Sequence, residues 1–327
     1  MKLYETDVKR FNDLVKAEPD ATIYQTSFWA DYMVQNGYKP LFLEMRDDKE
    51  ICQGLSMLLL KKESFFSNKL TAYAPLGFLI NWYDSSAFTA FHELLVRYLK
   101  ENRVNKLIIE PQVDQNDLPA KKMLEEAGYV KEGDLSVYEV DPVIHQNALC
   151  DPNIVLKIRS EESRTIFEKF AEKNDAENLK IFDSLKGHAL SYIACLDRLK
   201  SRRSLEENLS NLENYISQHK NDYKFVEDIA EKENQVRHLK KVLNAVNRFE
   251  GPQDPDIAAV CVSLFSDKCT IMFKTGIDTE DLFHAEKEII DQICTDCLNR
   301  GIIKIDSGER FYYSSERKLL GRYSLKI

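Results

Sequence analysis

A heptad-like pattern of apolar residues over roughly 200–248 limits what this stretch of the chain can form. The first run consists of Leu205, Leu209, Leu212 and Ile216, at spacings of 4, 3 and 4. A second run follows a break near Asn221 and Asp222 and consists of Ile229, Val236, Leu239, Leu243 and Val246. The intervening positions are rich in Lys, Arg, Glu and Asn. The pattern predicts two helices in an antiparallel coiled coil, either a solvated hairpin or an arm that contacts RNA.

The remainder of the chain divides into two halves with a similar order of elements, and the helical insertion lies in the second. In the first half, the patterns predict helices over 8–15, 26–36, 86–102 and 119–127, and strands over 39–46, 51–60, 70–73, 106–110 and 136–140. In the second, they predict helices over 160–173, 184–196 and 279–299, and strands over 257–266, 268–275 and 302–305. Antiparallel hairpins mixed with helical crossovers indicate an α/β (α+β) fold. We expect the segment 145–153, with its proline and short polar residues, to link two lobes.

Composition excludes several classes of function. A chain of 327 residues suits two lobes and an appendage. The net charge of −9 excludes a general affinity for nucleic acid, so any RNA contact needs a local basic patch. Residues 1–15 are amphipathic and charged, which excludes a standard signal peptide. Since no window holds the roughly 18 apolar residues of a membrane span, we expect a cytoplasmic protein.

The cysteines do not form a recognisable disulfide or metal framework. There are seven: Cys52, Cys150, Cys195, Cys261, Cys269, Cys294 and Cys297. The last two make a lone C-x-x-C inside a predicted helix, without a second pair or nearby histidines, which favours buried apolar side chains over a metal or redox site. Free thiols in this number favour a reducing cytosol.

Common enzyme signatures are missing from the sequence. It contains no P-loop, no G-x-G-x-x-G, no H-E-x-x-H and no G-x-S-x-G, and its six histidines show no ligand spacing. An acyl-CoA site needs a glycine-containing turn at a helix N-terminus, where backbone N–H groups hold the pyrophosphate. The closest strand connections, around Gly54 and Gly276, lack clustered glycines. This argues against CoA chemistry.

Six short segments, in order along nearly the whole chain, carry a family resemblance. They are Gln25-Thr-Ser-Phe-Trp29, Tyr73-Ala-Pro-Leu-Gly77-Phe-Leu-Ile-Asn81, Ile257-Ala-Ala-Val after the helical insertion, Thr275-Gly276, Ile305-Asp306-Ser307-Gly308 and Gly321-Arg-Tyr-Ser-Leu-Lys326. Together with the insertion, they resemble the FemA/FemX family of peptidoglycan interpeptide-bridge aminoacyltransferases.

The resemblance implies a fold and a domain division. We expect tandem GNAT-like (acyl-CoA N-acyltransferase-like) domains, the first over 1–144. The second would begin at 145–199, carry the coiled-coil arm over 200–248 and end with 249–327.

The resemblance also implies a reaction. An aminoacyl-tRNA would donate its amino acid to the stem-peptide amine of lipid II or of UDP-MurNAc-pentapeptide, without a cofactor, a metal or a protein nucleophile. The partners would be aminoacyl-tRNA, the lipid-linked precursor at the inner face of the plasma membrane, and a second copy or a paralogue, with no DNA. Two alternatives stay open: a catalytically inactive relative that acts as a partner or scaffold through its coiled coil, and a CoA-dependent N-acyltransferase.

Site residues follow from the resemblance position by position. Lys326 falls on a late lysine that faces the acceptor phosphates and the reaction centre, so we predict it as catalytic. The predicted substrate-binding residues are Tyr73, Asn81, Asp84, Lys169, Lys274 and Asp306. The sequence departs from the family where Met33 replaces a lysine and Asn81 an acid, and it ends one residue after Lys326, where the family continues through another strand.

Overall fold

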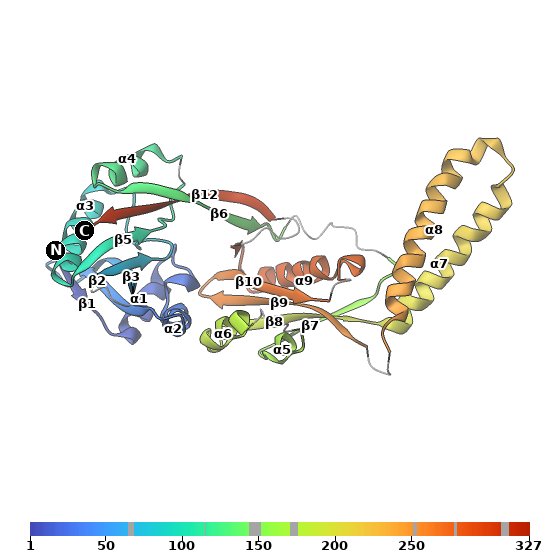
Figure 1. Ribbon diagram of the computed structural model, residues 1–327, viewed down its shortest axis with the longest axis horizontal. Helices are drawn as coiled ribbons and strands as arrows, with labels where there is room; N and C mark the ends of the chain where they lie inside the picture. Colours follow the sequence, from blue (N-terminus) through green and yellow to red (C-terminus); the bar gives the residue numbers. More distant parts are fainter. Residues whose placement is uncertain are drawn as a thin grey trace.

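Two lobes of mixed helices and strands lie side by side, and a pair of long helices projects from the second (Figure 1). The computed structural model describes residues 1–64, 69–114, 116–143, 152–170, 176–250, 254–277, 280–308 and 314–327. Within these residues, twelve strands form one sheet in the order β1-β2-β3-β4-β5-β12-β6-β11-β10-β9-β8-β7. The predicted α/β architecture is therefore present. The predicted linker, 145–153, falls largely outside the described residues.

The first lobe contains the N-terminal elements. Its strands are β1 (Lys2–Glu5), β2 (Lys39–Arg46), β3 (Cys52–Lys62), β4 (Leu70–Ala74), β5 (Val104–Ile109) and β6 (Val130–Val140). Its helices are α1 (Val8–Ala17), the short 3-10 turn η1 (Ile23–Gln25), α2 (Ser27–Gln35), α3 (Ser85–Glu101) and α4 (Leu118–Glu126). Helices α3 and α4 pack on one face of the sheet, and α1 and α2 on the other.

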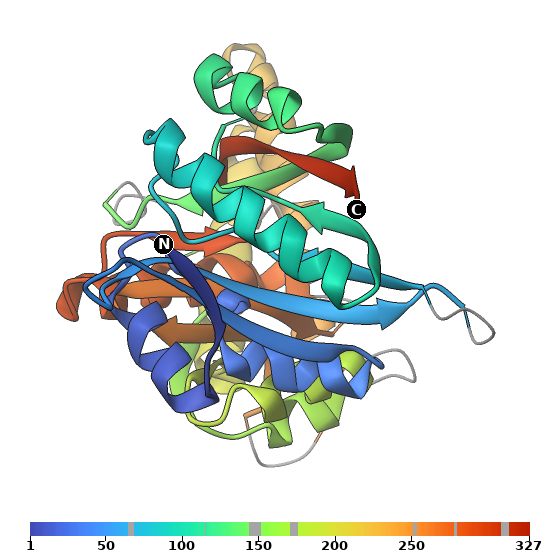
Figure 2. The ribbon, with the colours of Figure 1, turned by 90° about the vertical axis from the view of Figure 1, so that its left-hand side faces the viewer.

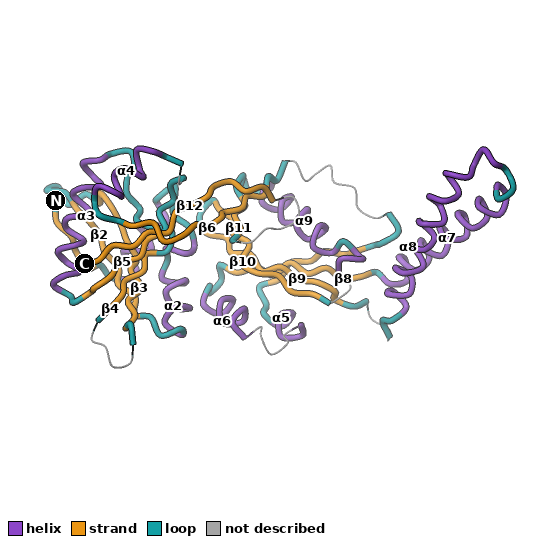
Figure 3. Tube along the Cα trace, turned by 45° about the horizontal axis from the view of Figure 1, so that its top comes forward, coloured by secondary structure: helices purple, strands orange, loops and turns teal. Residues whose placement is uncertain are grey.

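The second lobe repeats this plan around the helical insertion. Its strands are β7 (Leu156–Glu161), β8 (Ala189–Leu196), β9 (Asp256–Phe265), β10 (Lys268–Gly276), β11 (Ile305–Ser307) and β12 (Ser314–Lys326). Its helices are α5 (Thr165–Phe170), α6 (Ala176–Ser184), α7 (Arg198–His219), η3 (Tyr223–Phe225), α8 (Val226–Asn247), η4 (Glu280–Phe283) and α9 (Ala285–Asn299). Helix α9 covers one face of the sheet, and α5 and α6 the other (Figure 3).

Strands β6 and β12 form an antiparallel ribbon that belongs to both lobes. Ser314 lies opposite Val140 at one end of the ribbon, and Ser324 lies opposite Val130 at the other. The last four residues of β12 also pair with β5, whereas the last three of β6 pair with β11. Figure 2 shows the C-terminal strand lying within the sheet of the first lobe. Each lobe therefore needs a strand from the other half of the chain, an exchange that the sequence patterns do not predict.

A hydrophobic core, which we call the shared core, joins the lobes on the face opposite α3 and α9. It contains Phe11, Val15, Phe42 and Leu59 from the first lobe, and Ile166, Phe167, Ile193, Phe265 and Phe273 from the second. Removing this much apolar surface from water opposes separation of the lobes. The arrangement of the two lobes is therefore fixed by packing as well as by the ribbon.

One helix expected from the sequence is wrong, and another begins later than expected. The segment 184–196 ends α6 and then forms β8. The helix expected over 160–173 is present as α5, which begins at Thr165 after the end of β7. Strand β8 is covered on both faces, because Tyr192 points into the core under α9 while Ile193 points into the shared core. Such a strand is apolar throughout and lacks the alternation that distinguishes strands from buried helices. Strand β1 is also absent from the prediction.

The predicted hairpin of helices is present as α7 and α8, and its coiled-coil packing stays a prediction. The hairpin projects from the end of the second lobe that lies away from the first (Figure 1). At its base, Leu205, Val242 and Val246 are fully buried in the core of the second lobe. Nearer the tip, Ile216 and Ile229 are only partly buried. No helix in the described parts of the chain combines the length and hydropathy needed to cross a bilayer.

Shortening a buried side chain at the base of the arm should cost far more stability than shortening a side chain near its tip. Leu205→Ala removes a side chain that is 0% exposed, so we expect the free energy of unfolding to fall by about 2–5 kcal/mol. Ile216→Ala, the matched control, should cost roughly 1 kcal/mol. Denaturant titration followed by circular dichroism measures both. Equal losses would contradict the burial difference.

Gly321 should resist substitution because a Cβ atom there would overlap the ring of Tyr323, which is 3% exposed. We expect Gly321→Ala to destabilise the protein by about 1–3 kcal/mol, the usual cost of overpacking. Gly133 lies on the facing strand, opposite Arg322, and a Cβ there would meet nothing within 4 Å. Gly133→Ala should therefore change the melting temperature little, and a similar loss for both variants would refute the steric argument.

Candidate functional site

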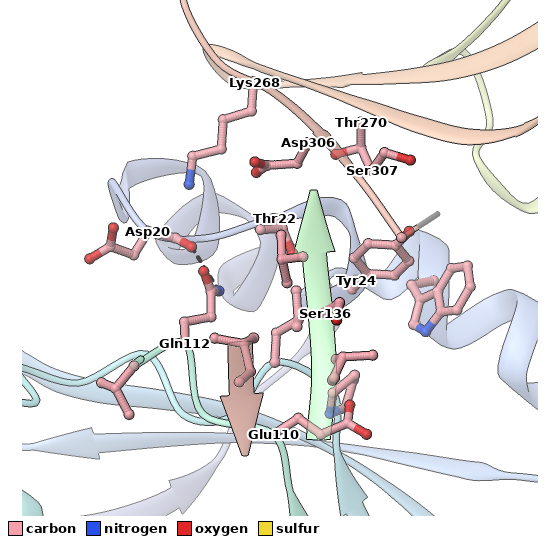
Figure 4. Close-up of a pocket in the computed structure, with 18 of the residues that line it drawn as sticks. Asp20, Thr22, Tyr24, Glu110, Gln112, Ser136, Lys268, Thr270, Asp306 and Ser307 are labelled. Atoms are coloured by element: carbon pink, nitrogen blue, oxygen red, sulfur yellow. Dashed lines mark hydrogen bonds between the residues drawn. The ribbon is translucent and has the colours of Figure 1, made fainter. Parts of the chain in front are cut away.

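A cavity of about 590 Å³ lies between the lobes, at the edge where β4, β5 and β11 end. The first lobe lines it with η1, α2, the loop after β4 and the segment after β5. The second lobe contributes the start of β10 and the end of β11, and the shared ribbon contributes Leu135, Ser136, Val137 and Leu320. The size is in the usual range for small-molecule sites. Figure 4 shows side chains from both lobes facing this space.

Tyr73 and Glu110 mark the first-lobe end of the cavity. The Tyr73 hydroxyl donates to Glu110 Oε2 at 2.6 Å, and Arg322 Nη1 donates to Glu110 Oε1 at 3.1 Å. The Arg322 guanidinium also lies 5.6 Å from the centre of the Tyr73 ring. Glu110 is only 5% exposed, so these two charge-assisted contacts offset its burial. Burial and the neighbouring Glu110 carboxylate raise the pKa of Tyr73 well above its ordinary value, so its phenol is protonated.

The side chain of Gln25 holds together the wall formed by η1. Its Nε2 donates to the Leu76 carbonyl at 3.1 Å, and its Oε1 accepts from the Thr22 backbone N–H at 3.0 Å. Gln112 Nε2 donates to Gln25 Oε1 at 3.3 Å and to the Asp20 carbonyl at 2.9 Å. These bonds tie η1 to the loop after β4 and to the segment after β5. They give a structural reason for the glutamine at the start of the Gln25–Trp29 segment.

Aromatic rings cover the same wall. Tyr24 and Trp29 meet edge to face with centroids 4.8 Å apart, and Trp29 contacts Tyr32 at 4.7 Å. All three line the cavity, together with Trp82 and Tyr83 from the loop after β4. Packed aromatic rings of this kind form a rigid surface that suits planar or apolar groups.

Charges of both signs gather at the second-lobe end. Lys268 and Lys304 line the cavity there, as do Asp306 and, from the first lobe, Asp20. The Lys268 ammonium donates to the Ala21 carbonyl at 2.8 Å. Burial lowers the pKa of Lys268, against the opposing effect of Asp20 and Asp306. Figure 4 places Lys268 and Asp306 opposite Glu110 across the cavity.

Three of the residues predicted to bind substrate line the cavity. Tyr73, Asn81 and Asp306 do so, and so does Met33, where the family has a lysine. Asp84 has another role in the structure, because its Oδ1 accepts from the backbone N–H of Ser86 at 2.9 Å and caps α3.

The three lysines predicted from the sequence do not line the cavity, and they have contacts elsewhere. Lys169 pairs with Asp256 at 3.2 Å, and Lys274 pairs with Glu286. Lys326 is exposed and lies opposite Lys106 in the register of β12 and β5. It is therefore held within a sheet. The roles predicted for Asp84 and these three lysines stay predictions.

Several cavity residues do not stand out in the sequence. Glu110 and Gln112 follow β5, and Lys268 begins β10, at positions without a recognisable motif. One signal that points to Glu110 is its place directly after a parallel strand, since ligands bind at the carboxyl ends of such strands. Arg322 reaches the site only through the strand exchange.

The two cysteines of the C-x-x-C lie buried on α9. No group of three or more His, Cys, Asp or Glu side chains there has a geometry that suits a metal ion. Cys294 and Cys297 are 1% and 2% exposed on α9. Burial raises the pKa of the Cys294 thiol to about 12, which makes it a poor ligand or nucleophile.

Two solved structures share this architecture over nearly their whole length. A crystal structure of FemX matches with a TM-score of 0.71 at 15% identity, covering 100% of this chain and 98% of that one. A tandem GNAT protein from the clavulanic acid biosynthesis pathway, solved without AcCoA, matches with a TM-score of 0.50 at 7% identity, covering 99% and 98%. No family model and no curated protein sequence matches the chain. The matches confirm, at the level of the fold, the tandem GNAT-like architecture and the FemA/FemX resemblance that the sequence motifs indicate.

A contact between the lobes beside the cavity should make stability depend on alkaline pH. Tyr32 donates to Glu177 of the second lobe, and burial together with this carboxylate raises the pKa of Tyr32 from 10.0 to about 12. This contribution is fully present below pH 10 and is lost as the pH rises towards 12, because the unfolded phenol ionises first. Between pH 9 and pH 11, the free energy of unfolding should fall by roughly 1 kcal/mol more for the wild type than for Tyr32→Phe.

Denaturant titration at the two pH values measures this difference. Tyr223 is 82% exposed on the arm, and Tyr223→Phe, as the control, should retain the pH dependence of the wild type. An identical pH dependence for wild type and Tyr32→Phe would show that the contact between the lobes does not form.

Proposed function

We propose that this protein is an acyltransferase that moves an amino acid from aminoacyl-tRNA to the stem-peptide amine of a peptidoglycan precursor. The observation that carries the proposal is the likeness to the FemX fold over the whole chain, with an open cavity between the lobes. The ordered motifs support it, because Gln25, Tyr73 and Asp306 all take part in building that cavity.

The cavity meets the physical requirements of the reaction. An ester carbonyl must be held beside a neutral amine, which demands a shaped space more than special chemistry. Lys268 and Lys304 offer cations for the phosphates of an acceptor, whether soluble and UDP-linked or lipid-linked. Glu110, Asp306 and the aromatic wall offer partners for an amine and for apolar parts of the substrates.

The helix N-termini in the described residues suit a donor other than CoA. In the first lobe, Asp84 already accepts from the backbone N–H groups of Ser86 and Ala87, at 2.9 and 3.2 Å. In the second, α9 carries Glu286 and Glu288 in its first turn. Phosphate needs free N–H groups, which Asp84 occupies at α3, and a positive end of the helix, which Glu286 and Glu288 counteract at α9. They weigh against the CoA-dependent alternative and support a reaction without a cofactor.

The projecting arm would bind the body of the tRNA while the acylated end enters the cavity. Exposed basic side chains on α7 include Arg202, which pairs with Glu206 at 2.8 Å, and on α8 Lys240, which pairs with Glu213 at 2.8 Å. These pairs are exposed and exchange partners at little cost, so RNA phosphates can replace the carboxylates. The reaction would take place at the inner face of the plasma membrane if the acceptor is lipid-linked.

A second candidate is a relative without catalytic activity that acts as a partner or scaffold. The observation that favours it is that Met33 and Asn81, two departures from the family pattern, both line the cavity. The arm would then contact a paralogue. Size measurement of the protein with and without the outer part of α7 and α8 tests this role. The base of the arm should be kept, because it belongs to the core.

The direct test is a transfer assay. The purified protein is incubated with tRNA charged with labelled amino acids, and with either UDP-MurNAc-pentapeptide or lipid II. We expect label in a product with a new amide bond, for one charged tRNA and one acceptor at least. The proposal fails if the folded protein binds neither substrate and no combination of charged tRNA and acceptor gives a labelled product.

The cavity cations should determine the affinity for the acceptor. We expect Lys268→Gln and Lys304→Gln each to raise the KM for the acceptor roughly tenfold or more, because each loses a charged contact to phosphate. Lys169→Gln and Lys274→Gln should change it less than about threefold, since those lysines pair with acids elsewhere. Steady-state kinetics compare the pairs. A larger effect for the second pair would support the assignment made from sequence.

A further inference from the structure

The hydrogen-bonded pair of Tyr73 and Glu110 is a proton donor linked to a proton acceptor at the wall of a cavity. The bond between Tyr73 Oη and Glu110 Oε2 measures 2.6 Å, and both residues line the cavity. The other carboxylate oxygen, Oε1, accepts from Arg322 at 3.1 Å. Glu110 is thus held in one orientation by two neighbours, and each of its oxygens keeps a lone pair for a further partner.

Burial assigns a state to the phenol, and hydrogen bonds assign a role to the carboxyl group. The raised pKa of Tyr73 keeps its phenol protonated, and Glu110 accepts hydrogen bonds from both Tyr73 and Arg322. The pair therefore presents one oxygen ready to give a proton and one ready to take a proton.

We propose that Glu110 and Tyr73 act as a proton relay in acyl transfer, with Arg322 as the positioning residue. The proposal rests on the aminoacyl transfer proposed above. Glu110 is the general base for the acceptor amine, and Tyr73 is the general acid for the departing oxygen.

The step balances without a further reactant. The neutral amine nitrogen forms a bond to the ester carbonyl carbon, and the bond between that carbon and the ribose oxygen of the tRNA breaks. The surplus proton of the amine passes to Glu110. The phenol proton of Tyr73 passes to the ribose oxygen, and the proton on Glu110 then moves along the 2.6 Å hydrogen bond to restore the phenol. The products are an amide and a free ribose hydroxyl, and both side chains regain their starting states.

The other polar groups around the cavity suit this role less well. Asp20 and Asp306 lie at the far end, near Lys268, as Figure 4 shows. Asn81 has an amide that does not take up a proton at neutral pH. Asp84 is engaged at the start of α3. Among the described residues that line the cavity, Glu110 is the carboxylate bonded directly to a phenol.

The test compares four variants in the transfer assay: Glu110→Gln, Tyr73→Phe, the double variant and Glu110→Ala. The first two keep the shape of the side chain and remove the proton chemistry. The matched controls are Glu5→Gln and Tyr98→Phe, since Tyr98 donates to Glu5 in a similar pair on the outer surface of the first lobe. Thermal unfolding of every variant checks that it is folded.

We expect Glu110→Gln and Tyr73→Phe each to lower kcat by about 10²–10⁴-fold, the usual contribution of general acid–base catalysis, with KM changed less than about threefold. The double variant should be no slower than the slower single variant, because both remove one relay. Added formate should raise the activity of Glu110→Ala at least tenfold. A purely structural role of Glu110 would not allow this rescue. The control variants should keep full activity.

Other outcomes overturn the relay. A folded Glu110→Gln or Tyr73→Phe variant with kcat within threefold of the wild type shows that the proton takes another route. Multiplying losses in the double variant, or no rescue by formate, show that the residues act separately or only support the fold. A wild type that transfers nothing removes the proposed function and the relay together, whereas an active wild type with active variants removes the relay alone.

Discussion

The antiparallel ribbon of β6 and β12 is the constraint on which the rest of the structure depends. Because its two strands pair with β5 in one lobe and with β11 in the other, it joins the two halves of the sheet and sets how the lobes are placed. The cavity lies beside this ribbon, and Leu135 and Leu320 form part of its lining. The ribbon also brings Arg322, a residue near the C-terminus, to Glu110 of the first lobe. Fold and site therefore have a common origin in one pair of strands.

The shared core gives the cavity a fixed shape before any substrate arrives. Phe42 of the first lobe and Phe273 of the second belong to it, and hydrogen bonds such as that from Tyr32 to Glu177 bridge the lobes. Wide opening of the lobes would expose this apolar surface, which makes a large hinge motion unfavourable. A preformed site reduces the entropy lost on binding two large substrates. Tight packing between the lobes thus favours a reaction that depends mainly on the placement of its two substrates.

Sequence patterns predict the local elements better than the long-range ones. The helices of the arm, the hairpin of β9 and β10, and the helix at α3 follow from periodicity, whereas the capping role of Asp84 emerges only from the structure. Strand β8 is missed because neighbours such as Tyr192 and Ile193 enter different cores, so that both faces are apolar. Of the cavity residues, Tyr73, Asn81 and Asp306 follow from motifs. Glu110 does not, and its contact with Arg322 depends on a pairing between residues far apart in sequence.

The strand exchange has a consequence for the order in which the protein folds as it leaves the ribosome. In the native sheet, Lys326 lies opposite Lys106, so the first lobe cannot be completed until β12 and the second-lobe elements before it have been made. Until then, one edge of β5 and both edges of β6 lack their native partners, and unpaired edges are templates for aggregation. Such a high contact order slows folding and lengthens this exposed stage. Two domains that each contained all of their own strands would cover these edges earlier.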